Sequence, residues 1–385
     1  MEETALGLKI IRPQSEALKT QLEESQIVWL QGPKGIGSLD LLKESLEELN
    51  ATSCLFEKKH YSSLPDNCSA YLPELKKLSG NKNRIVLSDA EFFPSIQNLL
   101  EETLVAENAP QIIVLASYKI EIDELLFEAL KQSGSVIELF PISFHEFAQT
   151  QGMGAIEKSL ESRLIYGAYP DVIDQPEKAD EILQQKIEEM LKTQISFTQR
   201  INKKEQLIRV LKVLAFEMGN LISYNDIAIQ CDLDNETVMR YVELFENAFI
   251  LKRISSYYSG KKYEMKKGVS VYFIDNGIRN ALINNFNSMD WRNDATALWR
   301  NWLMIEKMKW NASINRKAEY FTWQSHTKQH VDILEVCGSE MMAYQTSWTK
   351  KKKSKFPAGF TKNYPDATTF SLNRSTYWSF LTKKK

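Results

Sequence analysis

A glycine-rich turn near the start of the chain has the spacing of a phosphate-binding site. It runs from Gly32 to Leu39 (GPKGIGSL), directly after the apolar run QIVWLQ and before a helical pattern. Phosphate-binding loops follow GxxxxGK[ST], because backbone N–H groups wrap the phosphates, the Lys neutralises their charge and the hydroxyl holds Mg²⁺. Both glycines have this spacing, but Ser38 stands at the Lys position and Leu39 at the Ser/Thr position. The turn therefore predicts a degenerate phosphate loop, with an ordinary glycine turn as the alternative.

The segments around this turn alternate between strands and helices. Four short apolar runs predict strands at residues 26–31, 83–87, 111–116 and 136–139. Helical patterns separate these runs, which is typical of a parallel sheet that is covered on both faces. Ligands of such sheets bind at the carboxyl ends of the strands, and the glycine turn follows the first of them. The sequence therefore predicts an α/β fold with a binding site at this edge.

The rest of the chain begins with helical patterns and ends with short strands. Residues 206–254 predict three helices and an extended segment, with Gly219 as a C-cap and Ser223 and Asp234 or Asn235 as N-caps. Two strands joined by a basic loop follow, which completes the pattern of a winged helix-turn-helix. A long helix (ALWRNWLMIEKMKW) and the runs EYFTW, HVDILEV and MMAYQTSW then predict a further α/β domain.

Several motifs occur in one order along nearly the whole chain: QIVWLQGPKGIGSL, RIVLSDAEFFPSIQ, IIVLASYKIEI, IELFPISFHEF, YGAYPDVI and VYFIDNGIRNAL. In these motifs the chain resembles the bacterial and archaeal AAA-like P-loop ATPase family that ends in a restriction-endonuclease-like domain of unknown function. The resemblance implies an AAA-like ATPase domain over 1–152, a helical segment over 153–204, a winged helix-turn-helix over 205–285 and a nuclease-like α/β domain over 286–385. It also implies ATP as the cofactor.

The chain departs from this family at the residues that handle charge. The family's Mg²⁺-binding aspartate falls on Ser88, and its water-activating glutamate falls on Asp89. Asp89 and Glu91 are the candidate catalytic residues, but a carboxylate one residue further along a strand points to the opposite face. We therefore expect weak or absent ATP hydrolysis, nucleotide binding at most, and no firm Mg²⁺ site. The candidate nucleotide ligands are Gly32, Lys34, Gly35, Gly37 and Ser38.

The nuclease-like domain departs from the family in a similar way. An Asp on one strand and a Glu-x-Lys on the next would hold the metal for phosphodiester cleavage. Asp332 stands at the first position, but Gln345 and Ser347 replace the Glu and the Lys, and Arg300 replaces a helix glutamate. One carboxylate without partners is a poor metal site, so Asp332 is a remnant and we predict neither a metal nor cleavage.

Two histidines beside this position have the spacing of zinc ligands. His326 and His330 are four residues apart, which would place both imidazoles on one face of a helix. The segment QSHTKQHVDILEV instead predicts a loop that enters a strand, where the two side chains do not converge. We therefore predict no zinc site.

Charge is distributed unevenly along the chain. Residues 286–385 contain 17 Lys and Arg against 8 Asp and Glu, so their net charge is +9 and the remainder carries −11. A basic face is typical of a DNA or other polyanion partner, although a lysine tail also solubilises a chain end. The third helix of the winged-helix pattern offers Arg240 among several acids, which favours the wing and the C-terminal lysines instead. The candidate nucleic-acid ligands are Lys261, Lys262, Lys350, Lys351, Lys352 and Lys353.

Composition limits the remaining classes of function. A chain with 43% hydrophobic and 25% charged residues is typical of globular proteins, and no run approaches the ~18 apolar residues of a membrane span. The acidic start predicts no signal peptide, and four scattered cysteines predict free thiols in a reducing cytoplasm. Three functions stay open: a weakened P-loop protein that binds nucleotide, a DNA-associated module, and a scaffold for protein partners.

Overall fold

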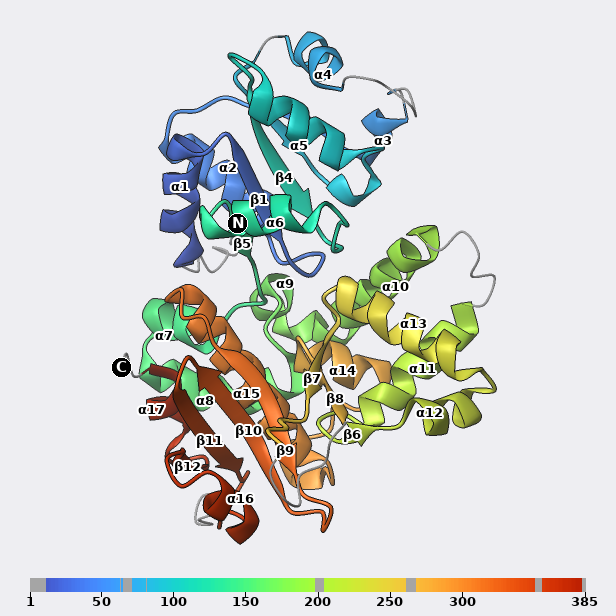
Figure 1. Ribbon diagram of the computed structural model, residues 1–385, viewed down its shortest axis with the longest axis vertical. Helices are drawn as coiled ribbons and strands as arrows, with labels where there is room; N and C mark the ends of the chain where they lie inside the picture. Colours follow the sequence, from blue (N-terminus) through green and yellow to red (C-terminus); the bar gives the residue numbers. More distant parts are fainter. Residues whose placement is uncertain are drawn as a thin grey trace, which may run out of the picture. The chain divides into compact units, whose positions relative to one another are not determined.

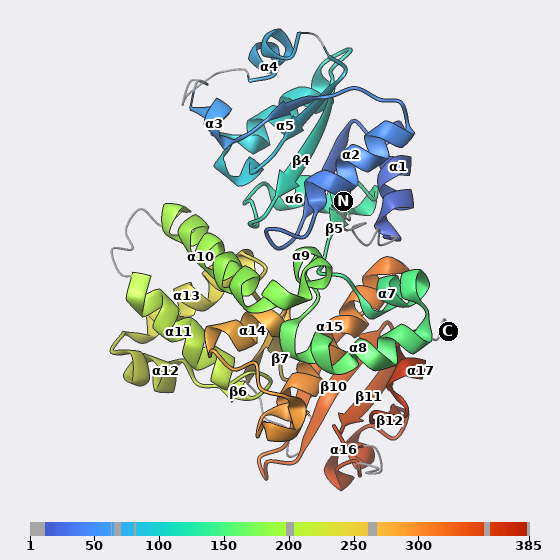
Figure 2. The same cartoon turned by 180° about the vertical axis from the view of Figure 1, so that it is seen from behind.

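The computed structural model describes residues 12–62, 64, 71–80, 82–197, 204–260, 268–349 and 355–382. Its chain forms two compact units, one of residues 11–140 (the N-terminal unit) and one that includes residues 141–385 (the C-terminal unit), drawn from two sides in Figure 1 and Figure 2. Within these described ranges, no helix is both long enough and apolar enough to cross a bilayer.

The N-terminal unit is built on a five-stranded parallel sheet with the order β2-β3-β4-β1-β5. Strands β1, β4 and β5 of this sheet are labelled in Figure 1. Its strands are β1 (Ile27–Gln31), β2 (Cys54–Phe56), β3 (Arg84–Leu87), β4 (Gln111–Ala116) and β5 (Val136–Glu138). The predicted parallel sheet and the four predicted strands are confirmed. The sequence does not predict β2, because three residues are too few to form a recognisable pattern.

Helices lie against both faces of this sheet, which explains why its strands are apolar on both sides. Trp29 of β1 belongs to a core cluster that includes apolar residues of α5 (Ile96–Val105). Leu30, the next residue along the strand, points to the opposite face and is also buried. Helix α1 (Gln14–Glu24) contacts β1 and β5. Each such buried side chain contributes about 1.5–3 kcal/mol relative to an exposed one.

The C-terminal unit begins with the helices α7 (Phe144–Gln151), α8 (Met153–Tyr166), α9 (Pro170–Asp174) and α10 (Ala179–Phe197). Helix α7 starts with a reciprocal cap. The Ser143 hydroxyl accepts the N–H of Glu146 at 3.1 Å, and the Glu146 carboxylate accepts the N–H of Ser143 at 2.6 Å. Such a pair satisfies two donors at a helix end, so these two residues of IELFPISFHEF have a structural role.

Three helices and a three-stranded antiparallel sheet follow. They are α11 (Lys204–Phe216), α12 (Tyr224–Cys231) and α13 (Asn235–Asn247), with β6 (Leu221–Ile222), β7 (Leu251–Ser255) and β8 (Val269–Phe273) in the order β6-β8-β7. The predicted N-caps are confirmed, since Ser223 and Asp234 accept the N–H groups three residues on at 3.2 and 2.7 Å. The prediction for Gly219 is wrong. Helix α11 ends at Phe216, and the Gly219 N–H donates to Val271 of β8 at 2.8 Å.

The last part contains a four-stranded sheet and the long helix α15 (Ala295–Ser313). The sheet has the order β12-β11-β10-β9, with β9 (Glu319–Gln324), β10 (His330–Cys337), β11 (Glu340–Thr346) and β12 (Thr368–Leu372). The long helix and the first three strands are confirmed predictions. The sequence does not predict β12, α16 (Ala358–Asn363) or α17 (Tyr377–Thr382), which are short and lack a clear apolar period.

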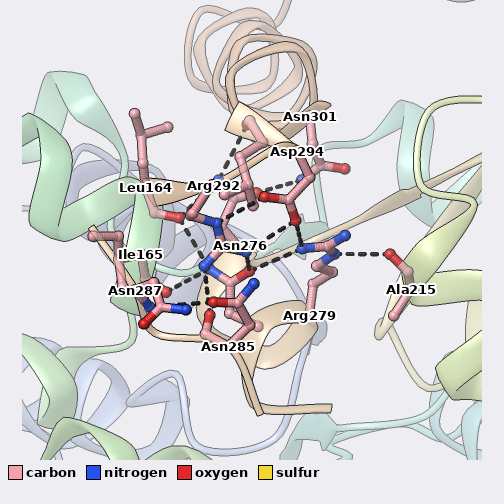
Figure 3. Close-up of polar contacts among 12 residues, drawn as sticks. Leu164, Ile165, Ala215, Asn276, Arg279, Asn285, Asn287, Arg292, Asp294 and Asn301 are labelled. Atoms are coloured by element: carbon pink, nitrogen blue, oxygen red, sulfur yellow. Dashed lines mark hydrogen bonds and ion pairs between the residues drawn. The ribbon is translucent and has the colours of Figure 1, made fainter. Parts of the chain in front are cut away.

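A buried ionic triad lies at α14 (Asn276–Leu282) in the C-terminal unit (Figure 3). The Asp294 carboxylate accepts hydrogen bonds from Arg279 and from Arg292, whose Nε and Nη2 lie at 2.8 and 2.9 Å. Arg279 also donates to the Ala215 carbonyl of α11 at 2.8 Å. The triad therefore links α14, α11 and the segment before α15.

Buried amide groups extend the same network. Asn280 donates to the Ile165 carbonyl of α8 at 2.7 Å, and Asn301 of α15 donates to Asn276 at 2.8 Å. Asn301 also accepts the N–H and donates to the carbonyl of Phe273, both at 2.8 Å. All these amide side chains are at most 3% exposed. The network gives a structural reason for the asparagines of VYFIDNGIRNAL.

The network also requires two helices to approach closely. A Cβ on Gly277 would lie 2.2 Å from the Tyr166 carbonyl oxygen at the end of α8. Gly167, which follows α8, has φ 76°, and a Cβ there would lie 1.9 Å from the Asp275 carboxylate. Glycine is therefore required at both positions.

We predict that Gly277→Ala destabilises the protein by about 3 kcal/mol, because the clash is with backbone that cannot move without disrupting the network. Urea unfolding measures this change. Gly154→Ala in α8 is the matched control, since no described atom beyond its chain neighbours and its own helix backbone lies within 4 Å of its Cβ position. It should leave stability unchanged or raise it by up to about 1 kcal/mol. Equal effects of the two variants would contradict the close-approach argument.

Candidate functional site

The glycine turn connects β1 to α2 (Ser38–Glu48) at the carboxyl edge of the N-terminal sheet. Gly35 and Gly37 have φ of 79° and 78°, a backbone conformation that favours glycine. Gly37 immediately precedes α2, and in the described chain no side chain caps this helix start. The first N–H groups of a helix lack internal partners and attract anions. The turn thus places an uncapped helix start directly after β1.

Glycine is needed at position 32 for a different reason. Its N–H donates to the Ala116 carbonyl at 3.2 Å, and a Cβ would lie 2.2 Å from the Leu139 carbonyl oxygen. The residue is therefore needed for close packing between β1 and the segment after β5. Because packing explains the glycine at this position, the residue is not evidence for phosphate binding.

Lys34 and Asp89 form an ion pair beside the loop, with 3.3 Å between Nζ and Oδ1. The expectation that Asp89 points to the opposite face is wrong. Strand β3 ends at Leu87, and Asp89 has φ 52°, so strand alternation no longer applies at this position. The left-handed turn directs the carboxylate toward Lys34 instead. Both side chains are partly exposed, by 39% and 31%.

Glu91 lies close to Asp89 but is held by another strand end. The Ser117 hydroxyl and N–H, which follow β4, donate to its two carboxylate oxygens at 2.6 and 3.2 Å. Burial raises the pKa of Glu91, while the hydrogen bonds from Ser117 oppose that rise. Ser117 is not among the site residues predicted from the sequence. It could have been found as a polar residue directly after a predicted strand, at the edge of the sheet where ligands bind.

The residues at this edge do not fit a Mg²⁺–triphosphate. Leu39 offers no hydroxyl for the metal, and Ser38 offers no charge for the phosphates. Asp40 adds a negative charge in the first turn of α2, and Asp89 engages Lys34. A phosphate group must therefore compete with a carboxylate for the loop lysine.

A second candidate site lies around Asp332 on β10, in the C-terminal unit. Its Oδ2 accepts the N–H and the hydroxyl of Thr346 at 2.7 and 2.9 Å. Its Oδ1 lies 3.3 Å from Arg300 Nη1 and 3.5 Å from His330 Nε2. Both carboxylate oxygens are thus engaged, and Arg300 supplies a positive charge beside them.

The predicted remnants of the metal site take other roles. Gln345 donates to the His330 carbonyl at 2.5 Å, and the Ser347 hydroxyl lies 2.9 Å from that of Thr349. His326 lies in the turn before β10, as expected of a loop that enters a strand. Among the residues with described positions, no three His, Cys, Asp or Glu side chains converge as a metal site. The Asp332 carboxylate is already bonded by Thr346 and paired with Arg300, and a single carboxylate is a poor ligand set for a divalent ion.

The charges around Asp332 shift two pKa values. Burial acts to raise the pKa of Asp332, but the hydrogen bond from His330 and the charge of Arg300 outweigh it and hold the pKa below its usual value. The hydrogen bond to Asp332 raises the pKa of His330 above 6.5, against the effect of burial. His330 is therefore more readily protonated than a free histidine.

The candidate nucleic-acid ligands cannot be placed. Lys261, Lys262, Lys350, Lys351, Lys352 and Lys353 lie outside the described residues. On α13, Val238, Tyr241, Val242 and Phe245 are buried, which confirms their assignment to the core face.

Comparisons with known proteins give a partial match and no assigned activity. A family model described as a domain of unknown function, DUF8612, matches residues 157–289, which hold most of α8 and all of α14. Arg292, Asp294 and Asn301 of the polar network lie beyond this match. An uncharacterised protein of Haemophilus influenzae is 23% identical over 254 residues, which are 62% of this chain and 62% of that protein. The chain therefore spans less than two thirds of this relative.

The likeness to two solved structures is low. A Walker-type ATPase of Pyrococcus abyssi is 12% identical and superposes with a TM-score of 0.48, covering 71% of this chain and 95% of that one. The RuvB Holliday junction branch migration motor of Thermotoga maritima is 13% identical, with a TM-score of 0.31 and coverage of 63% and 90%. At these TM-scores, neither neighbour carries weight for function.

We predict that His330→Gln reduces stability at low pH and has little effect at high pH. A raised pKa means that the imidazolium–Asp332 pair stabilises the fold fully below pH 6.5, and that this stabilisation is lost as pH rises through the higher folded pKa. Because the His330 side chain is 58% exposed, the difference should stay below about 1 kcal/mol. Urea unfolding from pH 5 to 9 measures it, and in an Asp332→Asn background the difference should disappear. A difference that grows with pH would contradict the pairing.

Proposed function

We propose that the N-terminal unit is a degenerate P-loop ATPase domain that binds the phosphates of a nucleotide at most, and hydrolyses ATP weakly or not at all. The observation that carries this proposal is the ion pair between Lys34 and Asp89 beside the glycine loop. The loop backbone has anion-binding geometry, but its lysine is already paired. ATP is the proposed ligand, without a dedicated Mg²⁺ site.

The placement of the loop supports this proposal. Strand β1, which leads into the loop, lies between β4 and β5 in the parallel sheet. Strand ends on both sides therefore surround the loop, as they do in sheets that bind ligands at their carboxyl edge. Ser117 follows β4, which neighbours β1, and Asp89 follows β3, the next strand beyond β4. They provide polar groups but no added cation.

For the whole chain we propose the domain order AAA-like unit (1–152), helical segment (153–204), winged helix (205–285) and nuclease-like domain (286–385). The three helices α11–α13 with the β7–β8 hairpin support the winged helix. The four-stranded sheet with α15 supports the nuclease-like domain. The ion pair between Asp332 and Arg300 supports the absence of phosphodiester cleavage. Asp332 is the one carboxylate present in the predicted metal-site motif, and it is already paired.

A second candidate function is a nucleic-acid-associated scaffold without enzymatic activity. The net charge of +9 over residues 286–385 favours it, and so does the pairing of the Asp332 carboxylate with Arg300. Such a module would hold a polyanion without cutting it. Protein partners are the remaining alternative.

We predict that Asp89→Asn strengthens polyphosphate binding and that Lys34→Gln weakens it. Removal of the carboxylate frees the lysine, and a partly exposed pair is worth up to about 1 kcal/mol, which corresponds to roughly fivefold in Kd. Fluorescence anisotropy of labelled ATP, with and without Mg²⁺, measures both changes. Phosphate release should stay near background in all variants. Ordinary Mg²⁺-dependent turnover that Gly37→Asp abolishes would overturn the proposal.

We predict that DNA binding, where it occurs, depends on the C-terminal lysines and is independent of sequence. Replacing Lys350, Lys351, Lys352 and Lys353 by Gln should weaken retention of all DNA sequences alike and lower the salt slope by about 0.7–0.9 per lost phosphate contact. Arg240→Ala in α13 is the control and should have a smaller effect. Filter binding over a salt series measures both, and the same DNA should remain intact with Mn²⁺. No retention at low salt would exclude this function.

A further inference from the structure

Arg12 joins the glycine loop to the end of the N-terminal sheet. Its Nη2 donates to the Ile36 carbonyl at 2.8 Å, and its Nη1 donates to the Phe140 carbonyl at 3.3 Å. Ile36 lies between the two left-handed glycines of the loop, and Phe140 lies two residues after β5. One guanidinium group from before α1 therefore holds a loop carbonyl in a fixed direction.

The planarity of the peptide gives this contact a consequence. The Ile36 carbonyl and the Gly37 N–H belong to the same peptide unit, and in a trans peptide they point in opposite directions. Because Arg12 holds the carbonyl on its own side, the Gly37 N–H must point away from Arg12. Glycine on either side of Ile36 would otherwise allow this peptide to rotate at little steric cost.

We propose that Arg12 is the positioning residue of the glycine loop: it fixes the Ile36–Gly37 peptide so that the Gly37 N–H is available to a phosphate. This inference rests on the proposed function and deepens it, since it names the group that sets the loop's orientation. Arg12 acts through the backbone and not by contact with the ligand. A phosphate oxygen then meets an N–H whose direction is set before binding, which reduces the ordering needed on binding.

Arg84 provides a matched comparison within the same unit. Its guanidinium also bonds a backbone carbonyl, that of Leu22 at 3.3 Å, and a side-chain oxygen of Gln111 at 2.9 Å. It lies at the amino end of β3, away from the edge that carries the loop. Arg84→Ala therefore removes a comparable arginine contact without touching the loop.

One labelling scheme isolates the relevant peptide. Ile36–Gly37 is the sole Ile–Gly pair in the sequence, so carbonyl-¹³C isoleucine with ¹⁵N glycine gives one carbonyl–amide correlation in NMR. We expect one sharp signal in the wild type, a shifted or split signal in Arg12→Ala, and an intermediate one in Arg12→Lys, which keeps one donor group. Arg84→Ala should leave the signal unchanged. The remaining ¹⁵N-glycine signals report whether each variant is folded. An unchanged signal in folded Arg12→Ala and Arg12→Lys, or an equal shift in Arg84→Ala, overturns the proposal.

Titration with inorganic diphosphate, without metal, separates this inference from the proposed function. We expect diphosphate to shift the Ile36–Gly37 signal of the wild type and to bind Arg12→Ala about tenfold more weakly. Equal affinity in the two proteins would overturn the positioning role and leave the proposed function intact. If neither diphosphate nor labelled ATP binds the wild type, the proposed function fails and the phosphate-directing part of the inference fails with it. The unliganded spectra still decide whether Arg12 orients the peptide.

Discussion

The C-terminal unit depends on the single carboxylate of Asp294, which lies between two buried arginines. Arg279 and Arg292 are 2% and 9% exposed, and a buried charge that loses its partner costs about 3–5 kcal/mol. Burial acts to raise the pKa of Asp294, but the hydrogen bond from Arg292 and the charge of Arg279 hold it below its usual value. Arg279 also reaches α11, and Arg292 reaches the carbonyl of Asn285. Because these contacts share one counter-ion, the helices that meet there cannot shift independently.

The sequence predicts the N-terminal sheet well, because each long strand is a continuous apolar run that follows a helical pattern. It does not predict the direction of Asp89, since that depends on a left-handed turn after β3 and no glycine or proline marks the turn. The Arg12 contact also escapes prediction, because it spans 24 residues to Ile36 and 128 to Phe140. The pattern of apolar and polar residues along the chain predicts helices and strands, whereas polar contacts between distant residues depend on tertiary packing.

Each candidate site contains an ion pair between two side chains of the protein. At the glycine loop, Asp89 pairs with Lys34, and at β10, Arg300 pairs with Asp332. In each place the countercharge of an ionisable side chain comes from within the protein. A buried carboxylate without a countercharge would be costly, so the hydrogen bond from His330 and the charge of Arg300 keep Asp332 ionised.

The two ion pairs differ in exposure, and this difference decides what each site can still bind. Lys34 and Asp89 are 39% and 31% exposed, whereas Arg300 and Asp332 are 15% and 6% exposed. An exposed pair is worth about 0–1 kcal/mol, so a ligand with several negative charges can compete with Asp89 for the lysine. Breaking the buried pair costs several times more, about 3–5 kcal/mol, and a divalent ion would also lose its water shell. The Lys34–Asp89 pair is therefore easier to break than the more buried Arg300–Asp332 pair.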